Sequence, residues 1–400
     1  MKTASRRRAP SLALGAAGFC ASISWQVVLP ILSLHLAHIG FSFAEIGIVV
    51  GVFSLSMGLV ELQAGVIAAA VGRRRQLLGA FAANALCLGV AAIGQARWLV
   101  AVALTAVGAA RGVLVPPLHA TVADSSTPED RGRAFGTFWL CTSFAALTGP
   151  AIGGFVAART GERTPFVLGA LFSLAALPLM AGWPMPGRAA NRASFRDFIA
   201  FLSTASVARL GVAILLCYSV AGIWTTFLPL YASRQGVSVL FIGWIFAIQG
   251  GMYALMQVPT GRLVARDHGR WLMLAAIAGT AGTEFAIPLV RGVPLLLAAG
   301  AVYGVAWGIM PVTFAMLMTR RVSADQYTAA MSVYNSAIDL GLFAGPLLGA
   351  AVTRWSLTVP FLLALPLGLA AAAIGPGASS QQAGQGMVPD RRGSPPAACR

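Results

Sequence analysis

Twelve long apolar stretches, separated by short polar segments, constrain this 400-residue chain more than any other feature. A helix needs about 20 residues to cross a hydrocarbon layer of roughly 30 Å, and each stretch is about that long. Only 10% of the residues are charged, so the chain lacks the polar surface that a soluble protein needs. We therefore predict an all-α integral membrane protein. The twelve predicted spans are residues 12–36, 44–70, 76–96, 98–122, 133–158, 164–184, 210–233, 239–265, 271–291, 294–319, 327–353 and 357–377.

The basic residues are unevenly distributed among the polar segments. The net charge is +16, and most of the 28 Lys and Arg residues lie in the N-terminal segment, in alternate loops and in the C-terminal tail. Cytoplasmic loops of membrane proteins are enriched in these residues. We therefore predict a multi-pass protein of the cell (inner) membrane with both termini in the cytoplasm, and no nucleic-acid partner. The loops on the other side contain Arg97, Arg159, Arg163, Arg234, Arg291 and Arg354.

The second half of the chain repeats the first. The segment WQVVLP from Trp25 is matched by WTTFLP from Trp224, and a series of glycines then recurs at a constant offset. The matched positions are Gly40 and Gly236, Gly47 and Gly243, Gly65 and Gly261, Gly108 and Gly304, Gly112 and Gly308, Gly149 and Gly345, and Gly153 and Gly349. A series at constant offset indicates an internal duplication. The predicted parts are a cytoplasmic segment (1–11), a six-helix bundle (12–184), a cytoplasmic central loop (185–209), a second six-helix bundle (210–377) and a disordered cytoplasmic tail (378–400).

Two kinds of motif follow the repeat. After the second span, Gly65 is followed by VIAAAV, the turn residue Gly72 and the basic run Arg73, Arg74 and Arg75. Glycine permits close helix crossings and tight turns, and basic residues complement the C-terminal end of a helix dipole. The fifth and eleventh spans each contain a Gly-Pro motif with small residues at close spacing. These motifs comprise Gly149, Pro150 and Gly153, and Gly345, Pro346 and Gly349.

These motifs and the six-plus-six repeat resemble the major facilitator superfamily over about residues 12–377. The resemblance implies two six-helix bundles related by a pseudo-two-fold axis and a transport mechanism of alternating access. The Gly-Pro motif implies the drug and metabolite:proton antiporters of that superfamily. One position departs from the pattern, because Ala69 stands where the loop motif usually has an acidic residue. We expect Asp124, at the end of the fourth span, to substitute in part.

Three charged residues within or beside the spans are candidates for work in transport, since charges at membrane depth usually mark a pathway or a pair. Arg111, in the middle of the fourth span, is expected to contact substrate or a carboxylate. Asp339, in the eleventh span, either binds and releases a proton or is a hydrogen-bonded packing residue. Glu61 either titrates or pairs with cytoplasmic arginines, and we favour pairing. For Glu284, seven residues before Arg291, we expect snorkelling or a local structural role.

The resemblance also implies a cavity lined by the first, fourth, seventh and tenth spans. Aromatic and amide side chains there favour an apolar or cationic organic solute. Aromatic belts at the membrane interface would place the same residue types without any substrate. The candidate lining residues are Trp25, Gln26, Tyr218, Trp224, Tyr303 and Trp307.

The chain has no motif for nucleotide hydrolysis, and its five cysteines have no spacing typical of a metal site or disulfide framework. We therefore predict a non-enzymatic transporter without cofactor or metal, driven by an ion gradient, most plausibly of protons. Efflux of a small organic solute or drug by antiport is favoured over import by proton symport. A transporter-like sensor or scaffold is a further alternative, which the residue at position 69 supports and Arg111 and Asp339 oppose. Because both halves lie in one chain, we expect a functional monomer.

Overall fold

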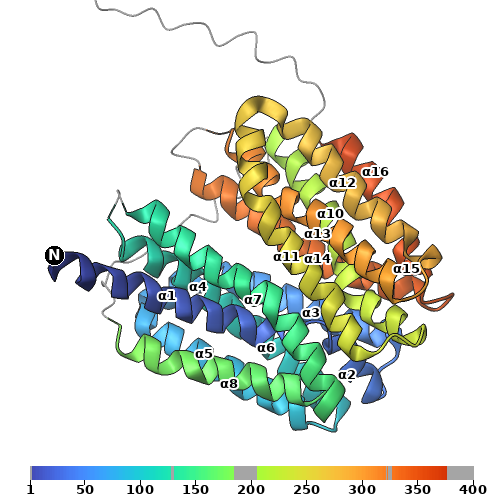
Figure 1. Ribbon diagram of the computed structural model, residues 1–400, viewed down its shortest axis with the longest axis horizontal. Coiled ribbons are helices and arrows are strands. Elements are labelled where there is room, and N and C mark those ends of the chain that lie inside the picture. Colours follow the sequence, from blue (N-terminus) through green and yellow to red (C-terminus); the bar gives the residue numbers. More distant parts are fainter. Residues whose placement is uncertain (1, 128–129, 184–204, 321, 323–326, 376–400) are drawn as a thin grey trace, which may run out of the picture.

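The computed structural model describes residues 2–127, 130–183, 205–320, 322 and 327–375 (Figure 1). Ten helices in these ranges are long and apolar enough to cross a membrane. The helices Lys2–Gln26 and Leu32–His38 cover the first predicted span, and Val359–Leu362 and Ala364–Ile374 cover most of the last, so the predicted all-α membrane fold is confirmed. Most of the predicted central loop (185–209) and all of the predicted tail (378–400) lie outside the described residues.

The first half of the chain forms one group of helices, drawn in blue to green in Figure 1. Helix α1 begins at Lys2, so residues 2–11 of the predicted N-terminal segment are helical and continuous with the first predicted span. The helices are α1 (Lys2–Gln26), α2 (Leu32–His38), α3 (Phe43–Glu61), α4 (Ala64–Val71), α5 (Arg73–Ile93), α6 (Arg97–Asp124), α7 (Arg131–Thr160) and α8 (Thr164–Ala181).

The second half forms the other group, drawn in yellow-green to red in Figure 1. The helices are α10 (Ala205–Arg234), α11 (Val239–Leu263), η1 (Val264–His268), α12 (Gly269–Ala286), η2 (Ile287–Leu289), α13 (Val293–Thr319), α14 (Tyr327–Val352), α15 (Val359–Leu362) and α16 (Ala364–Ile374). The packing of the first half recurs here. The contacts of α1 with α7, α3 with α6, α5 with α6 and α5 with α8 have counterparts in α10 with α14, α11 with α13, α12 with α13 and α12 with α16.

The two groups meet through two pairs of helices that the repeat also relates. Helix α3 packs against α14, and α11 packs against α7. A Cβ atom added to Gly47 would lie 2.5 Å from the carbonyl oxygen of Pro346, and one added to Gly243 would lie 2.6 Å from that of Pro150. Each glycine therefore faces the motif proline of the opposite half, at equivalent positions. Away from these contacts the halves diverge toward the end where α1 begins (Figure 1).

The first predicted span is broken, whereas its repeat is continuous. Helix α1 ends at Gln26 and the chain turns through residues 27–31 before α2, because Pro30 lacks an N–H and its ring clashes with the carbonyl four residues earlier. Pro229 lies at the equivalent position inside the continuous helix α10. There the hydroxyl groups of Thr225 and Thr226 donate to the carbonyl oxygens of Ala221 and Gly222, one turn earlier. The first copy has no hydroxyl at the matching positions.

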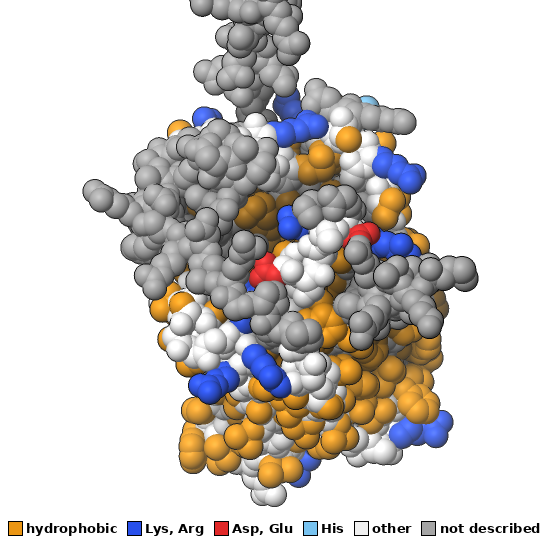
Figure 2. Space-filling view, turned by 90° about the vertical axis from the view of Figure 1, so that its left-hand side faces the viewer, with side chains coloured by type: hydrophobic (Ala, Val, Ile, Leu, Met, Phe, Trp, Pro, Cys, Tyr) orange, Lys and Arg blue, Asp and Glu red, His pale blue; other side chains and the backbone are white. Residues whose placement is uncertain are grey.

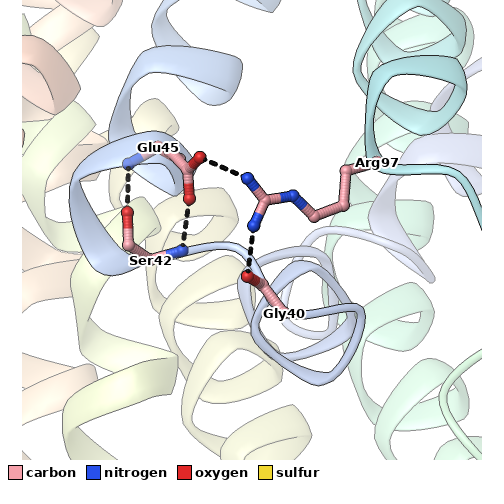
Figure 3. Close-up of polar contacts among 4 residues, drawn as sticks. All are labelled: Gly40, Ser42, Glu45 and Arg97. Atoms are coloured by element: carbon pink, nitrogen blue, oxygen red, sulfur yellow. Dashed lines mark hydrogen bonds and ion pairs between the residues drawn. The ribbon is translucent and has the colours of Figure 1, made fainter.

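A cap fixes the start of α3 at the end where the halves meet (Figure 3). The backbone N–H of Glu45 donates to the Ser42 hydroxyl at 3.3 Å, and the N–H of Ser42 donates to the Glu45 carboxylate at 2.7 Å. Arg97, at the start of α6, donates to the Glu45 carboxylate and to the carbonyl of Gly40. This capping box therefore joins the loop after α2 to two helices.

We expect Ser42→Ala to lower the free energy of unfolding by about 1 kcal/mol, since the side chain that caps α3 is lost. The measurement is the midpoint of thermal unfolding of the purified protein in detergent. Ser125→Ala, at the exposed C-terminal end of α6, is the matched control and should leave that midpoint unchanged. Equal midpoints for the two variants would show that the cap contributes nothing.

Candidate functional site: a cavity between the two halves

A cavity of about 370 Å³ lies between the two helix groups. Its walls come from α1, α2, α3 and α7 of the first half and from α10, α11, α13 and α14 of the second. The side chains that line it are mostly apolar and aromatic, with a few amides and hydroxyl groups. They include Ser22, Trp25, Gln26, Val50, Phe53, Trp139, Thr142, Thr225, Phe246, Gln249, Tyr253, Trp307 and Leu342.

None of these lining side chains is an acid, a lysine, an arginine or a histidine. Trp25 stacks on Phe53, with ring centroids 4.4 Å apart and the planes 6° from parallel, which fixes a flat aromatic surface on one wall. Aromatic faces bind apolar groups and organic cations, and isolated amides orient a ligand. The cavity is therefore suited to a small organic solute and not to a phosphorylated one.

Arg111 lies behind this aromatic wall. Its guanidinium group donates to the carbonyl oxygen of Ala21 at 3.1 Å, and its carbon atom Cζ lies 5.4 Å from the centroid of Trp25. The Trp25 ring thus contacts Phe53 and the cation, and also faces the cavity. Arg111 is not among the residues that line the cavity, and it contacts the lining residue Trp25.

Two carboxyl groups meet where the halves cross at α3 and α14. A Cβ atom added to Gly58 would lie 2.7 Å from Cβ of Asp339, so this glycine makes room for the Asp339 side chain against α3. Glu61 follows Gly58 by one helical turn, so it lies on about the same face of α3 as the contact with Asp339. Both lie closer to the diverging end of the molecule than Ser54 and Leu342, which line the cavity. Each half therefore contributes one carboxyl group to this crossing.

The predicted lining residues divide between the cavity and the interior of the second half. Trp25, Gln26 and Trp307 line the cavity. The other three, Trp224, Tyr303 and Tyr218, are buried behind it, at 0%, 1% and 5% exposure. The structure therefore differs from the expectation for these three, because their faces of α10 and α13 turn into the second bundle. The structure adds lining residues on α3, α7 and α11, whose mid-span aromatic and amide residues are the signal that could have found them.

The sequence matches the Major Facilitator Superfamily over residues 14–242 and again over residues 210–381. The chain belongs to this superfamily. It is accordingly a multi-pass membrane transporter for small molecules rather than an enzyme.

Several relatives in the superfamily are resistance proteins. A class G tetracycline resistance protein from Vibrio anguillarum is 25% identical over 342 residues, which cover 80% of this chain and 83% of that protein. The multi-drug resistance efflux pump PmrA from Streptococcus pneumoniae is 30% identical over 168 residues, covering 40% of this chain and 41% of the pump. The quinolone resistance protein NorA from Staphylococcus aureus is 26% identical over 159 residues, covering 37% and 38% of the two chains.

Solved structures of the superfamily share the fold. A variant of the nucleoside transporter NupG superposes with a TM-score of 0.81 at 14% identity, covering 91% of this chain and 99% of that one. A bacterial homologue of the human lysosomal transporter Spinster, in an inward-facing and occupied conformation, gives a TM-score of 0.75 at 15% identity, covering 92% and 96% of the two chains.

The superfamily's Gly-Pro motifs lie at close crossings within each half. A Cβ atom at Gly153 would overlap the carbonyl oxygen of Val27, in the turn after α1. A Cβ atom at Gly149 would lie 2.5 Å from Cβ of Gln26, which lines the cavity. In the second half, Gly345 lies equally close to the carbonyl oxygen of Ser219, and Gly349 to the ring of Phe227. In each half, the Gly-Pro motif therefore packs against the part of the chain around WQVVLP or WTTFLP.

The superfamily's loop motif, here Gly65 to Arg75, has one substitution, at position 69, and one glycine that makes no close contact. Asp124, the residue expected to substitute in part for the acidic residue missing at position 69, forms an ion pair with Arg73. Gly72 has φ +83°, a conformation that favours glycine, and Arg74 donates to the carbonyl oxygen of Ala181. The close crossing expected at Gly65 is not made. Nothing lies within 4 Å of a Cβ atom placed there, since the halves diverge at this end.

Proposed function

We propose that this protein exports a small organic solute or drug in exchange for protons, by alternating access. The cavity between the two halves carries the proposal, because an aromatic, uncharged cavity at the interface of two related bundles is what a rocking transporter presents to its solute. The relatives named for resistance to tetracycline and quinolones and for multi-drug efflux support export and an organic substrate.

The conformation supports loading from the cytoplasm. The halves touch near Gly47 and Gly243 and diverge toward the end where α1 begins. Lys and Arg side chains (blue) are spread over that end, which faces the viewer in Figure 2. Since cytoplasmic loops carry the positive residues, we assign this open end to the cytoplasm, with both termini there and the protein in the inner membrane. The single chain contains both halves, so we propose a functional monomer.

The proton site that we propose for this cycle is the carboxyl pair of Glu61 and Asp339. Two negative charges brought together between closely packed helices repel each other, and a proton bound by either group removes the repulsion. The two groups lie on opposite halves, so rocking changes the distance between them. Protonation then stabilises the arrangement in which α3 and α14 are packed, and deprotonation favours their separation at this end. Proton binding and the position of the halves are thereby linked.

We expect Asp339→Asn to lose solute accumulation driven by a pH gradient, because the amide cannot exchange a proton. The measurement uses proteoliposomes with an internal pH-sensitive dye, challenged with cationic, neutral and anionic organic solutes. Glu162→Gln is the matched control, since Glu162 pairs with His38 outside the cavity and should keep wild-type coupling.

The sign of the dye response in the wild type separates the alternatives. Opposite movement of solute and protons supports antiport, and movement in the same direction supports symport and overturns the proposed exchange. No proton movement with any solute would exclude proton coupling for that panel and favour the transporter-like sensor. Wild-type coupling in Asp339→Asn would remove this residue from the proton site.

A further inference from the structure

Glu284, in helix α12, is enclosed within the second half of the molecule. Its exposure is 0%, and neither carboxyl oxygen has a hydrogen-bond partner in the structure. Of the two roles expected for Glu284, snorkelling or a local structural role, snorkelling does not fit this enclosed position. Arg291 is exposed beyond the end of α12, whereas Glu284 lies on the face of α12 that packs into the bundle.

No basic side chain faces Glu284 from the described helices around it. Helix α12 packs against α10, α13, α15 and α16, and the last two contain only apolar residues and glycine. The buried ionisable groups on these helices include Tyr303 of α13 and Cys217 of α10. Tyr303 lies one turn from Ala306, whose Cβ atom is 2.6 Å from a Cβ atom added to Gly279 of α12. Arg270 and His268 are at the far end of α12, more than three turns away. An ionised carboxylate without a cation or hydrogen-bond donor is strongly disfavoured in such a place, so Glu284 carries a proton in this conformation.

Two buried aromatic side chains lie between this part of the second half and the central cavity. The hydroxyl of Tyr303 is buried without a hydrogen-bond partner in the structure. Its ring stacks on Trp224, with centroids 3.9 Å apart and planes 9° from parallel. The Trp224 indole N–H donates to the side-chain oxygen of Gln249 at 2.9 Å, and Gln249 lines the cavity. Glu284 is thus separated from the solute site by one stacked aromatic pair.

We propose that Glu284 is a second proton-binding site, within the C-terminal half, which exchanges its proton with the central cavity through Tyr303. This inference rests on the proton coupling proposed above. Glu284 and the Tyr303 hydroxyl are not hydrogen-bonded to each other in this conformation. When water enters beside the Trp224–Tyr303 stack and bridges the two groups, the Glu284 O–H bond breaks and its proton passes to the bridging water, which gives one of its own protons to the Tyr303 hydroxyl oxygen. That hydroxyl gives its proton to a second water on the cavity side. The carboxylate left behind is stabilised by the hydroxyl and the water until it is protonated again. Because the proton leaves and returns at the wall of the cavity where the solute binds, solute and proton compete.

The first test does not depend on transport. Infrared absorption of the purified protein in ester-free detergent reports the C=O stretch of a protonated carboxylic acid. We expect a band at neutral pH in the wild type that is lost in Glu284→Gln and retained in Thr280→Val, a matched change of a buried residue one turn earlier. A spectrum unchanged by Glu284→Gln would overturn the assignment of a proton to Glu284, whatever the transport assays show.

The second test concerns proton exchange with the cavity. In proteoliposomes loaded with ethidium as the probe, we compare accumulation driven by a pH gradient with exchange at equal pH. Glu284→Gln should lower the ratio of the first rate to the second by about tenfold or more, Tyr303→Phe should lower it in part, and Thr280→Val should not. Loss of the infrared band with an unchanged ratio would show a proton that takes no part in coupling, and would overturn the proposal. If wild-type protein shows no gradient-driven movement, the coupling proposal fails, and this inference fails with it.

Discussion

Gly153→Ala is expected to lower the free energy of unfolding by about 3 kcal/mol, which for a membrane protein appears as a severe loss of folded material. The added methyl group would overlap the backbone oxygen of Val27, and a backbone atom in the turn after α1 cannot move aside as a flexible side chain does. Helices α1 and α7 would have to separate along the contact that also positions Gln26. The change is a single methyl group, so lost polarity or charge would not explain the result.

The measurement is the yield of monodisperse protein and its thermal unfolding midpoint in detergent. Gly79→Ala is the matched control, since Gly79 lies in a helix of the same half and nothing is within 4 Å of its added Cβ atom. That control should match the wild type or exceed it slightly, because alanine favours helix more than glycine does. A Gly153→Ala protein as stable as Gly79→Ala would mean that the crossing of α1 and α7 is looser than described.

Gly243→Val is expected to abolish most transport while the protein still folds. Gly243 faces the carbonyl oxygen of Pro150 and the Cα atom of Gly154, at 2.6 and 2.8 Å from an added Cβ atom. This contact lies between the two halves, so a larger residue penalises the conformation in which they touch at this end. Overpacking by about 1–3 kcal/mol shifts a conformational equilibrium by roughly 5- to 150-fold. The protein should then be trapped with this end open.

Alkylation of a cysteine at position 33 reports the shift. Ser33 is 1% exposed, on α2, and lines the cavity near the end where the halves meet. In a background without native cysteines, Ser33→Cys should react faster from the outer face when combined with Gly243→Val. Gly282→Val, which places the same side chain on an open face of α12, is the control. Slow labelling together with full transport in Gly243→Val would contradict the assigned closure contact.

The repeat explains why much of this fold was predictable. Glycines matched at a constant offset reappear in the structure as matched contacts, as when Gly47 and Gly243 each face the proline of the other half. A pattern that depends on close backbone approach is visible in sequence, because only glycine fits. The ion pair of Asp124 with Arg73 was predictable for a related reason, since a missing charge is replaced by a charge nearby.

Helix rotation was not predictable in the same way. Trp224 and Trp25 occupy equivalent positions in the repeat, yet Trp25 lines the cavity and Trp224 is buried behind it. A turn of a few tens of degrees about the helix axis decides between these places, and an apolar helix has no polar face that would reveal its rotation. The enclosed position of Glu284 was not predictable for the same reason, because its distance along the chain to Arg291 says nothing of the direction in which its helix faces.

The break after Gln26 makes the two halves mechanically unequal, although they share one pattern. Helix α10 runs unbroken past Pro229, so we expect a displacement of one end of this helix to move its other end as well. The chain between α1 and α2 has a joint of five residues in the corresponding place, and this joint lies beside the cavity. We therefore expect bending to be concentrated in the first half, while the second half moves as a more rigid unit. The duplication produced two related halves, and the sequence around one of the two matched prolines gives a joint to the first half alone.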